Sequence, residues 1–244
     1  MKKTNWLIFA AFAAAAALLR VWQDRTGFED TGLAVRGNIP GLLLPLVLTL
    51  AAAYFIYTAR KLPVKRDESC ELADCFMLEG ALPLACIVAG AFLVVVGSLA
   101  FVREESALTH LLLALFASAS AISMIGAAGA LRGGKAVNGV VLLVPVCALV
   151  VYLIFLYRAD ASNPVLARIY VEILAAALLT FSAVERAAFA FRNGSPRVYR
   201  SVGAMAALLS LTAATEGGSL AALLFFAGCA IAELGFLAAF RFEP

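Results

Sequence analysis

Two glutamates inside long apolar stretches are the residues of this sequence best placed to do chemistry. Glu172 and Glu233 each have hydrophobic residues on both sides. A charged side chain in the middle of a membrane helix costs about 2.5–3.5 kcal/mol on insertion scales, so such residues are rare unless they are paired or functional. Intramembrane carboxyl groups bind cations, carry protons or join helices, and both glutamates are candidates for these roles.

Glu172 has a candidate partner on its own helix. Arg168 precedes it by four residues, which places the two side chains one helical turn apart. The pair predicts a clamp for a zwitterionic or anionic solute. The alternative interpretation is an ion pair that neutralises itself and serves only to pack helices together.

Glu233 has no basic residue within reach on its own helix. The neighbouring small residues Gly228, Ala232 and Gly235 let a second helix approach closely. We therefore expect the Glu233 carboxyl group to be protonated or paired across helices. It is either a proton- or cation-linked site or a hydrogen-bonded packing residue. Arg168, Glu172 and Glu233 are the predicted ligand-binding residues, with the two glutamates at different depths.

Redox and hydrolytic enzymes need residues that this sequence lacks. His110 is the only histidine, and one histidine can neither ligate a haem from both sides nor build a multi-histidine metal site. The chain has no GxSxG, HExxH or phosphate-binding glycine loop. Cys70 and Cys75 are too widely spaced for a redox CxxC and lack zinc-binding histidines, so we expect inert thiols. The sequence predicts no cofactor and favours a non-enzymatic role.

The composition requires these residues to lie in membrane helices. Of the 244 residues, 64% are hydrophobic and 14% are charged, and the mean hydropathy is +0.96. A soluble globular protein has about 45–50% apolar and about 25% charged residues, so a soluble core is excluded. Each membrane crossing takes roughly 20 apolar residues. The stretches that qualify are residues 5–21, 39–57, 76–102, 108–131, 137–157, 164–189, 199–214 and 219–240.

The sequence therefore predicts an all-α fold, a polytopic bundle of eight transmembrane helices. We expect one integral membrane domain over residues 1–244 and no soluble domain. Tight turns such as 132–135 and 193–196 make neighbouring helices antiparallel hairpins. Pro45, Pro83 and Pro145 each follow a glycine in the first half of a stretch and predict kinks. Residues 1–19 also fit a signal peptide, and its cleavage would leave seven helices.

The basic residues predict how the bundle is oriented. Lysine and arginine are enriched in cytoplasmic loops. One side of the predicted bundle carries Lys2, Lys3, Arg60, Lys61, Lys65, Arg66, Arg132, Lys135, Arg192, Arg197, Arg200 and Arg241. The other side carries only Arg20, Arg25, Arg36, Arg103, Arg158 and Arg168. We therefore expect a plasma (inner) membrane protein with both termini in the cytoplasm.

Two functional hypotheses follow. The first is a protein that binds or transports a small solute at an intramembrane site containing the buried carboxyl groups. The second is a non-catalytic membrane subunit, sensor or scaffold that packs against another membrane protein or a second copy. The net charge of +3 is spread over short loops, so nucleic acid is not an expected partner. A polar cavity that reaches Glu172 or Glu233 would favour the first hypothesis, and dry burial of both would favour the second.

Overall fold

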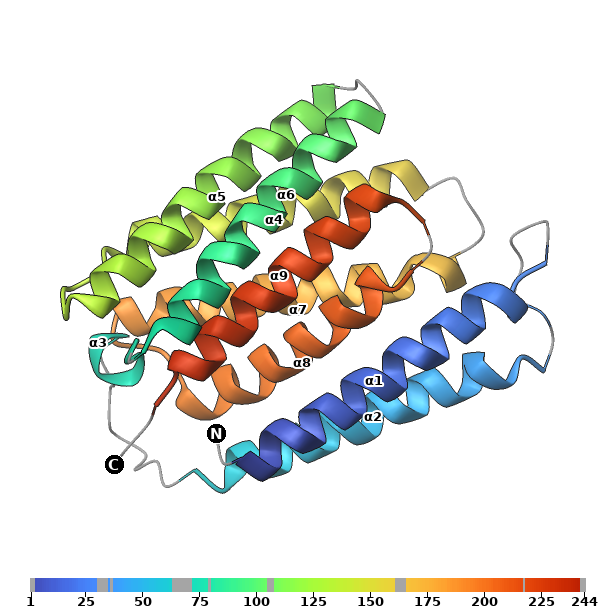
Figure 1. Cartoon of the computed structure of the whole chain (residues 1–244), viewed down its shortest axis with the longest axis horizontal. Helices are drawn as coiled ribbons and strands as arrows, with labels where there is room; N and C mark the ends of the chain where they lie inside the picture. The colour runs from blue at the N-terminus through green and yellow to red at the C-terminus, as the bar shows by residue number, and fades with distance from the viewer. Residues whose placement is uncertain are drawn as a thin grey trace.

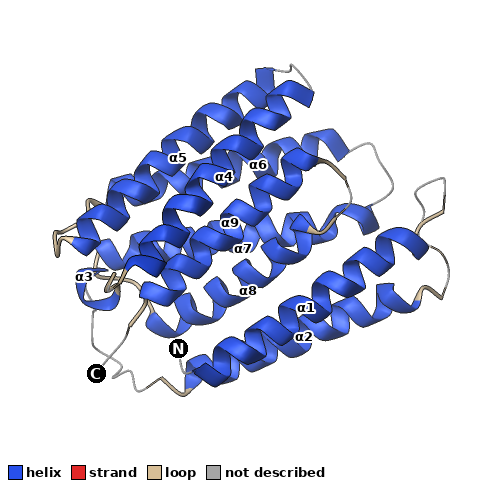
Figure 2. Cartoon of the chain, in the orientation of Figure 1, coloured by secondary structure: helices blue, strands red, loops and turns tan. Residues whose placement is uncertain are grey.

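The computed structural model describes residues 3–29, 35, 37–62, 72–78, 80–104, 108–160, 166–216 and 218–241. Within the helices, the side chains of residues 3, 74, 158–160 and 166–168 fall outside this description. The described chain consists of helices and loops (Figure 2). The helices are α1 (Lys3–Thr26), α2 (Ile39–Arg60), α3 (Leu72–Cys75), α4 (Ala81–Glu104), α5 (Leu108–Arg132), α6 (Gly139–Asp160), α7 (Leu166–Ala190), α8 (Pro196–Ala214) and α9 (Leu220–Ala239). The predicted all-α bundle with eight long helices is confirmed.

Seven of the eight long helices are long and apolar enough to cross a membrane, which makes this a multi-pass membrane protein. The eighth long helix is α8, which is not apolar enough to be a candidate span. Its first turns carry Arg197 and Arg200, which lower its mean hydropathy. Because α8 packs against α1, α2, α7 and α9, most of its surface faces other helices rather than lipid.

Helices α4 to α9 form a closed ring. Each of them packs against the next along the chain, and α9 returns to pack against α4. The α1–α2 hairpin lies outside this ring and packs mainly against α8 (Figure 1). The ring is the part of the fold that encloses an interior, so it positions the candidate site.

The closest contact in the ring joins α4 to α9, and glycines make it possible. A Cβ atom at Gly90 would lie 2.4 Å from the backbone nitrogen of Ala232. A Cβ atom at Gly228 would lie 2.6 Å from the backbone nitrogen of Val94. These distances leave no room for any side chain, so the two backbones touch directly.

The two ends of the bundle differ in how they are closed. One end, called the α3 end below, holds α3, the start of α1 and the end of α9 (Figure 1). Four aromatic rings from different segments meet there with centroids 5.1–6.1 Å apart. They belong to Phe76, Phe189, Tyr199 and Phe240, which we call the aromatic seal. The opposite end, called the Arg20 end, holds the end of α1 and the turn between α8 and α9.

The prediction that a helix starts at Phe76, the first residue of the stretch 76–102, is wrong. Residues Phe76 to Leu78 are extended, not helical: Met77 donates its backbone N–H to Ala239 at 2.9 Å, and Phe76 pairs with Phe240. Gly80 has a φ of +86°, a left-handed conformation that precedes the helix start at Ala81.

Two of the three predicted proline positions are confirmed as helix-interior. Pro45 and Pro145 lie inside α2 and α6, whereas Pro83 falls in the first turn of α4, where its missing N–H costs nothing. Pro145 cannot donate to the carbonyl of Val141. The Ser123 hydroxyl group on α5 donates to that carbonyl instead, at 2.5 Å.

The expectation of inert loop thiols is wrong for Cys75. This residue, at the end of α3, is fully buried and disulfide-bonded. Cys70 lies outside the described residues.

Candidate functional site

A cleft of about 250 Å³ opens inside the ring towards the Arg20 end. Glu172 on α7 lies in its wall, and the Tyr152 hydroxyl group on α6 donates to Glu172 Oε2 at 3.4 Å. The remaining lining comes from α4, α5, α6 and the start of α9: Phe101, His110, Leu113, Phe155, Leu156, Gly218, Ser219 and Ala222. One of the two predicted intramembrane glutamates therefore lines a cleft.

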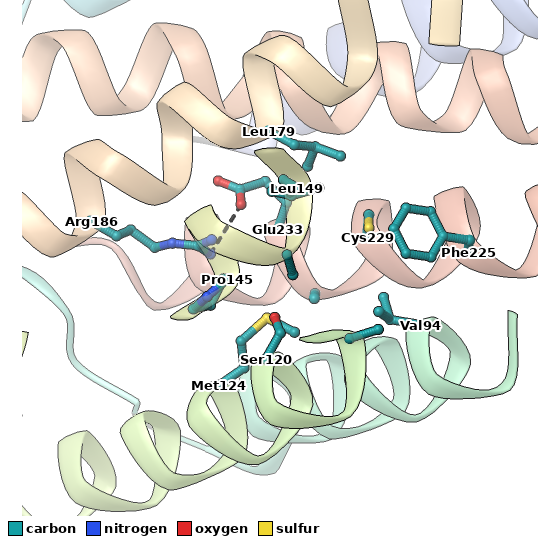
Figure 3. Close-up of a pocket in the computed structure, with 13 residues that line it drawn as sticks. Val94, Ser120, Met124, Pro145, Leu149, Leu179, Arg186, Phe225, Cys229 and Glu233 are labelled. Carbon is teal, nitrogen blue, oxygen red and sulfur yellow. Dashed lines mark ion pairs between the residues drawn. The ribbon is translucent and has the colours of Figure 1, made fainter. Parts of the chain in front are cut away.

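A second, smaller cavity of about 40 Å³ lies in the same ring, and its wall includes Glu233 on α9. This volume is enough for one or two water molecules. Arg186 reaches towards Glu233 on one side of the cavity, and Ser120 and Met124 of α5 lie on the facing side (Figure 3). The cavity thus has the Arg186–Glu233 pair on one wall, and the hydroxyl group of Ser120 beside the apolar Met124 on the other.

The Glu233 carboxyl group is held by two side chains of α7. Arg186 Nη1 on α7 lies 3.0 Å from Glu233 Oε2, and the Ser182 hydroxyl group donates to Oε1 at 2.5 Å. The guanidinium group of Arg186 also lies over the Phe236 ring, 4.2 Å from its centroid. A Cβ atom at Gly203 would come within 2.8 Å of Glu233 Oε1, so α8 must have glycine where it passes the pair. The expectation that Glu233 is paired across helices is confirmed.

Arg186 and Ser182 were not among the predicted site residues. Arg186 is close to the end of its apolar stretch, where a long basic side chain can usually reach the membrane surface. In the structure it is buried with Glu233. The available signal was charge balance: an arginine and a glutamate on separate apolar helices compensate each other when they meet.

The cleft and the cavity are stacked along the bundle. On each of the five helices that line both, the cavity residues lie nearer the α3 end than the cleft residues. Phe101 and Tyr152 line the cleft, and Phe225 lines the cavity. The Tyr152 and Phe225 rings are stacked with centroids 4.9 Å apart, and Phe101 lies 6.3 Å from each. These three rings, called the aromatic partition, separate the two spaces.

A second buried polar cluster lies outside the ring interior. Arg20 of α1 is fully buried and contacts Glu216, which follows α8. Arg20 also donates to Gln23 Oε1 at 2.9 Å and lies 3.9 Å from Asp24. The Tyr170 ring lies 5.7 Å from the guanidinium carbon. The cluster joins the α1–α2 hairpin to the ring.

Burial raises the pKa of Glu216 to about 8, although the nearby Arg20 pulls it down. Glu172 and Asp24 raise it further through their negative charge. At neutral pH the Glu216 carboxyl group therefore holds its proton most of the time.

Glu172 and Glu233 are the two predicted ligand-binding residues whose side chains the structure describes, and they are not brought together at one point. Glu172 lies in the cleft and Glu233 in the cavity, with the aromatic partition between them. The side chain of Arg168 falls outside the described part of the structure, so its pairing with Glu172 stays a prediction. Among the described residues, no group of three or more His, Cys, Asp and Glu is placed to hold a metal ion.

Comparison with known proteins gives no assignment. No protein family, no curated protein and no solved structure matches this chain.

Proposed function

We propose that this multi-pass membrane protein binds and transports a small solute through the interior of the α4–α9 ring. The solute would enter the cleft at Glu172, pass the aromatic partition and reach the Arg186–Glu233 pair. The aromatic seal would close the path at the α3 end in this conformation. Transport by alternating access requires a site that is open to one side and closed to the other.

One observation carries this proposal: the two spaces are stacked along one axis, and each has a glutamate in its wall. Buried charged groups are expensive in a membrane and are retained where they face a water-filled space. A helix bundle held together only by packing needs neither space. The conformation that opens the cleft and the conformation that opens the cavity would differ in the positions of the Phe225, Tyr152 and Phe101 rings.

We place the cleft on the outer side of the plasma membrane, with both termini in the cytoplasm, from the distribution of basic residues. The disulfide at Cys75 favours the opposite orientation, because disulfides persist on the oxidising side of a membrane. The basic residues weigh more, since they come from several loops. A reporter fused after Pro244 should give a cytoplasmic signal, and a reporter inserted near Asp160 should give an external signal. The reverse result would contradict this orientation and support the opposite one.

A partner-binding role is the second candidate, and α5 supports it. Gly126 and Gly129 face open space, with no other part of the described chain within 4 Å of a Cβ atom placed there. They lie beside Ile122, which is 73% exposed. Exposed glycines on a membrane helix let a second helix approach closely. Replacing Gly126 and Gly129 with leucine should then shift the oligomeric state in mild detergent, whereas an unchanged state would remove this candidate.

The transport proposal is tested by filling the cleft. Ala222 lines the cleft, and its neighbour Leu223 is 43% exposed on the outer surface of α9. In a thermal-shift screen of small solutes, at least one solute should stabilise the wild type and the Leu223→Trp control. The same solute should lose its effect on Ala222→Trp. Stabilisation that survives in Ala222→Trp, or a screen without any stabilising solute, would contradict the proposal.

A further inference from the structure

The cleft has aromatic side chains arranged around a carboxyl group. Phe101, Tyr152 and Phe155 line the cleft that Glu172 enters, and the His110 ring stacks on Phe101 with 6.0 Å between centroids. The face of an aromatic ring carries partial negative charge and attracts cations. A carboxyl group next to such rings adds a full counter-charge, which is the combination that recognises organic ammonium groups.

We propose that the cleft binds the protonated amino group of a small solute with an apolar body. The ammonium group would contact Glu172, and the apolar body would lie against the rings of Phe101, Tyr152 and Phe155. This inference rests on the proposed function, because it assigns a substrate class to the same cleft. The volume of about 250 Å³ limits the solute to a small one, since pockets for drug-sized ligands measure about 300–1,000 Å³.

The other groups around the cleft agree with a cationic ligand. Leu113, Leu156 and Ala222 are apolar, and none of the described lining residues is a lysine or arginine. An anion would therefore meet aromatic faces and a glutamate, which repel it. The Tyr152 hydroxyl group donates to Glu172 Oε2 and so holds the carboxyl group facing the cleft.

Two sources of an ammonium group are compatible with this geometry: a simple amine and an amino acid. The shared feature is the ammonium group at Glu172. A series of ligands that share one apolar group distinguishes a simple amine from an amino acid as the ligand class.

The experiment compares four compounds that share a phenyl-bearing body: benzylamine, phenylglycine, benzyl alcohol and benzoate. Binding is measured with the full-length protein in lipid nanodiscs. Benzylamine or phenylglycine should bind at least about tenfold more tightly than benzyl alcohol and benzoate. Tighter binding of phenylglycine would identify an amino acid as the ligand class, and tighter binding of benzylamine would identify an amine.

Variants then locate the binding. Glu172→Gln should weaken binding of the ammonium compound about tenfold or more and leave benzyl alcohol unaffected, because only the charge is removed. Glu185→Gln is the matched control: it lies on the same helix, outside the cleft, where it accepts a hydrogen bond from the Ser195 backbone at 3.3 Å. Tyr152→Phe should cause a smaller loss, since it keeps the ring and removes only the hydroxyl group that orients Glu172.

The outcomes separate this inference from the proposed function. Preferential binding of benzoate or benzyl alcohol that disappears in Ala222→Trp would overturn the ammonium site and leave the cleft as a solute site. Equal binding of the ammonium compound to wild type and Glu172→Gln would also overturn it. Absence of cleft-dependent binding by any solute in the broader screen would overturn the proposed function itself.

Discussion

Within the described residues, an arginine and a glutamate meet in two buried contacts, and these differ in what surrounds them. Arg186–Glu233 joins α7 to α9 within the ring, receives a hydroxyl group from Ser182 and faces a cavity. Arg20–Glu216 joins α1 to the turn after α8, and Asp24 and Gln23 share the guanidinium group. Only the first lies on the proposed path through the protein.

This difference shows how the same pair of residue types can serve binding in one place and assembly in another. Near the end of the bundle, a carboxyl group whose pKa is raised by burial can stay protonated when its arginine is removed. Inside the ring, the loss of one partner leaves the other charged and far from bulk water. The two contacts should therefore respond differently to the same substitutions.

The largest effect is expected for Arg186→Leu. This change leaves Glu233 without its guanidinium partner and should lower the free energy of unfolding by about 3–5 kcal/mol. The double variant Arg186→Leu/Glu233→Leu should recover most of that loss and should no longer be stabilised by any solute that binds at the pair. Thermal unfolding in nanodiscs measures both. If the double variant is as unstable as Arg186→Leu, the two side chains do not stabilise each other, and the prediction is wrong.

Arg20→Leu should have a smaller effect, about 2 kcal/mol, because Glu216 already holds a proton at neutral pH and tolerates the loss. The expected consequence is weaker attachment of the α1–α2 hairpin to α8. Solute binding in the cleft should be retained. A loss equal to that of Arg186→Leu, measured in the same way, would remove the distinction between the two contacts.

Ser182→Ala removes the hydroxyl group that donates to Glu233 and should cost about 1.5 kcal/mol, the range of a hydrogen bond to a charged group. Ser210→Ala is a matched control, since Ser210 is also buried but donates only to the Ala206 carbonyl of its own helix. The control should change stability by less than about 0.5 kcal/mol. Equal effects on unfolding would mean that Ser182 contributes nothing specific to the pair.

The last prediction concerns how the stability depends on pH through Glu216. Its pKa in the folded protein is about 8, above the usual 4.5, so folding favours the protonated form. The stabilising contribution is complete below about pH 4.5 and is lost as the pH rises through about 8, by up to about 1.4 kcal/mol per pH unit. Glu216→Gln should remove this slope from the melting temperature, whereas Glu104→Gln, at an exposed position, should retain it. A slope unchanged in Glu216→Gln would exclude this group as its source.

The sequence was sufficient to predict the helices but not their neighbours. Hydropathy identifies each stretch because every crossing must bury about the same length of backbone in lipid. It also identifies Glu172 and Glu233, since charge within such a stretch is unusual. The pairing of Glu233 with Arg186 was missed, because Arg186 lies on another helix and the order of helices around a ring leaves no periodic signal; charge balance was the one hint.

Local exceptions were missed for a related reason. Phe76 is as apolar as the residues that follow it, so composition alone extends the helix to it; its pairing with Phe240 depends on the far end of the chain. Pro83 looks like a kink until Gly80 is known to delay the helix start. In both cases a tertiary contact or a backbone angle overrides the pattern.

The contact between α4 and α9 has a consequence for biosynthesis. Helix α4 ends at Glu104 and α9 begins at Leu220, so the ribosome must make four more long helices before α9 can leave the insertion machinery. Until then, the glycine face at Gly90 and Gly97 has no partner from this chain, because its neighbours in the finished protein are Ala232 and Phe225. Ring closure is therefore a late, long-range step of assembly, and truncation before α9 should leave a nascent chain that quality-control proteases recognise.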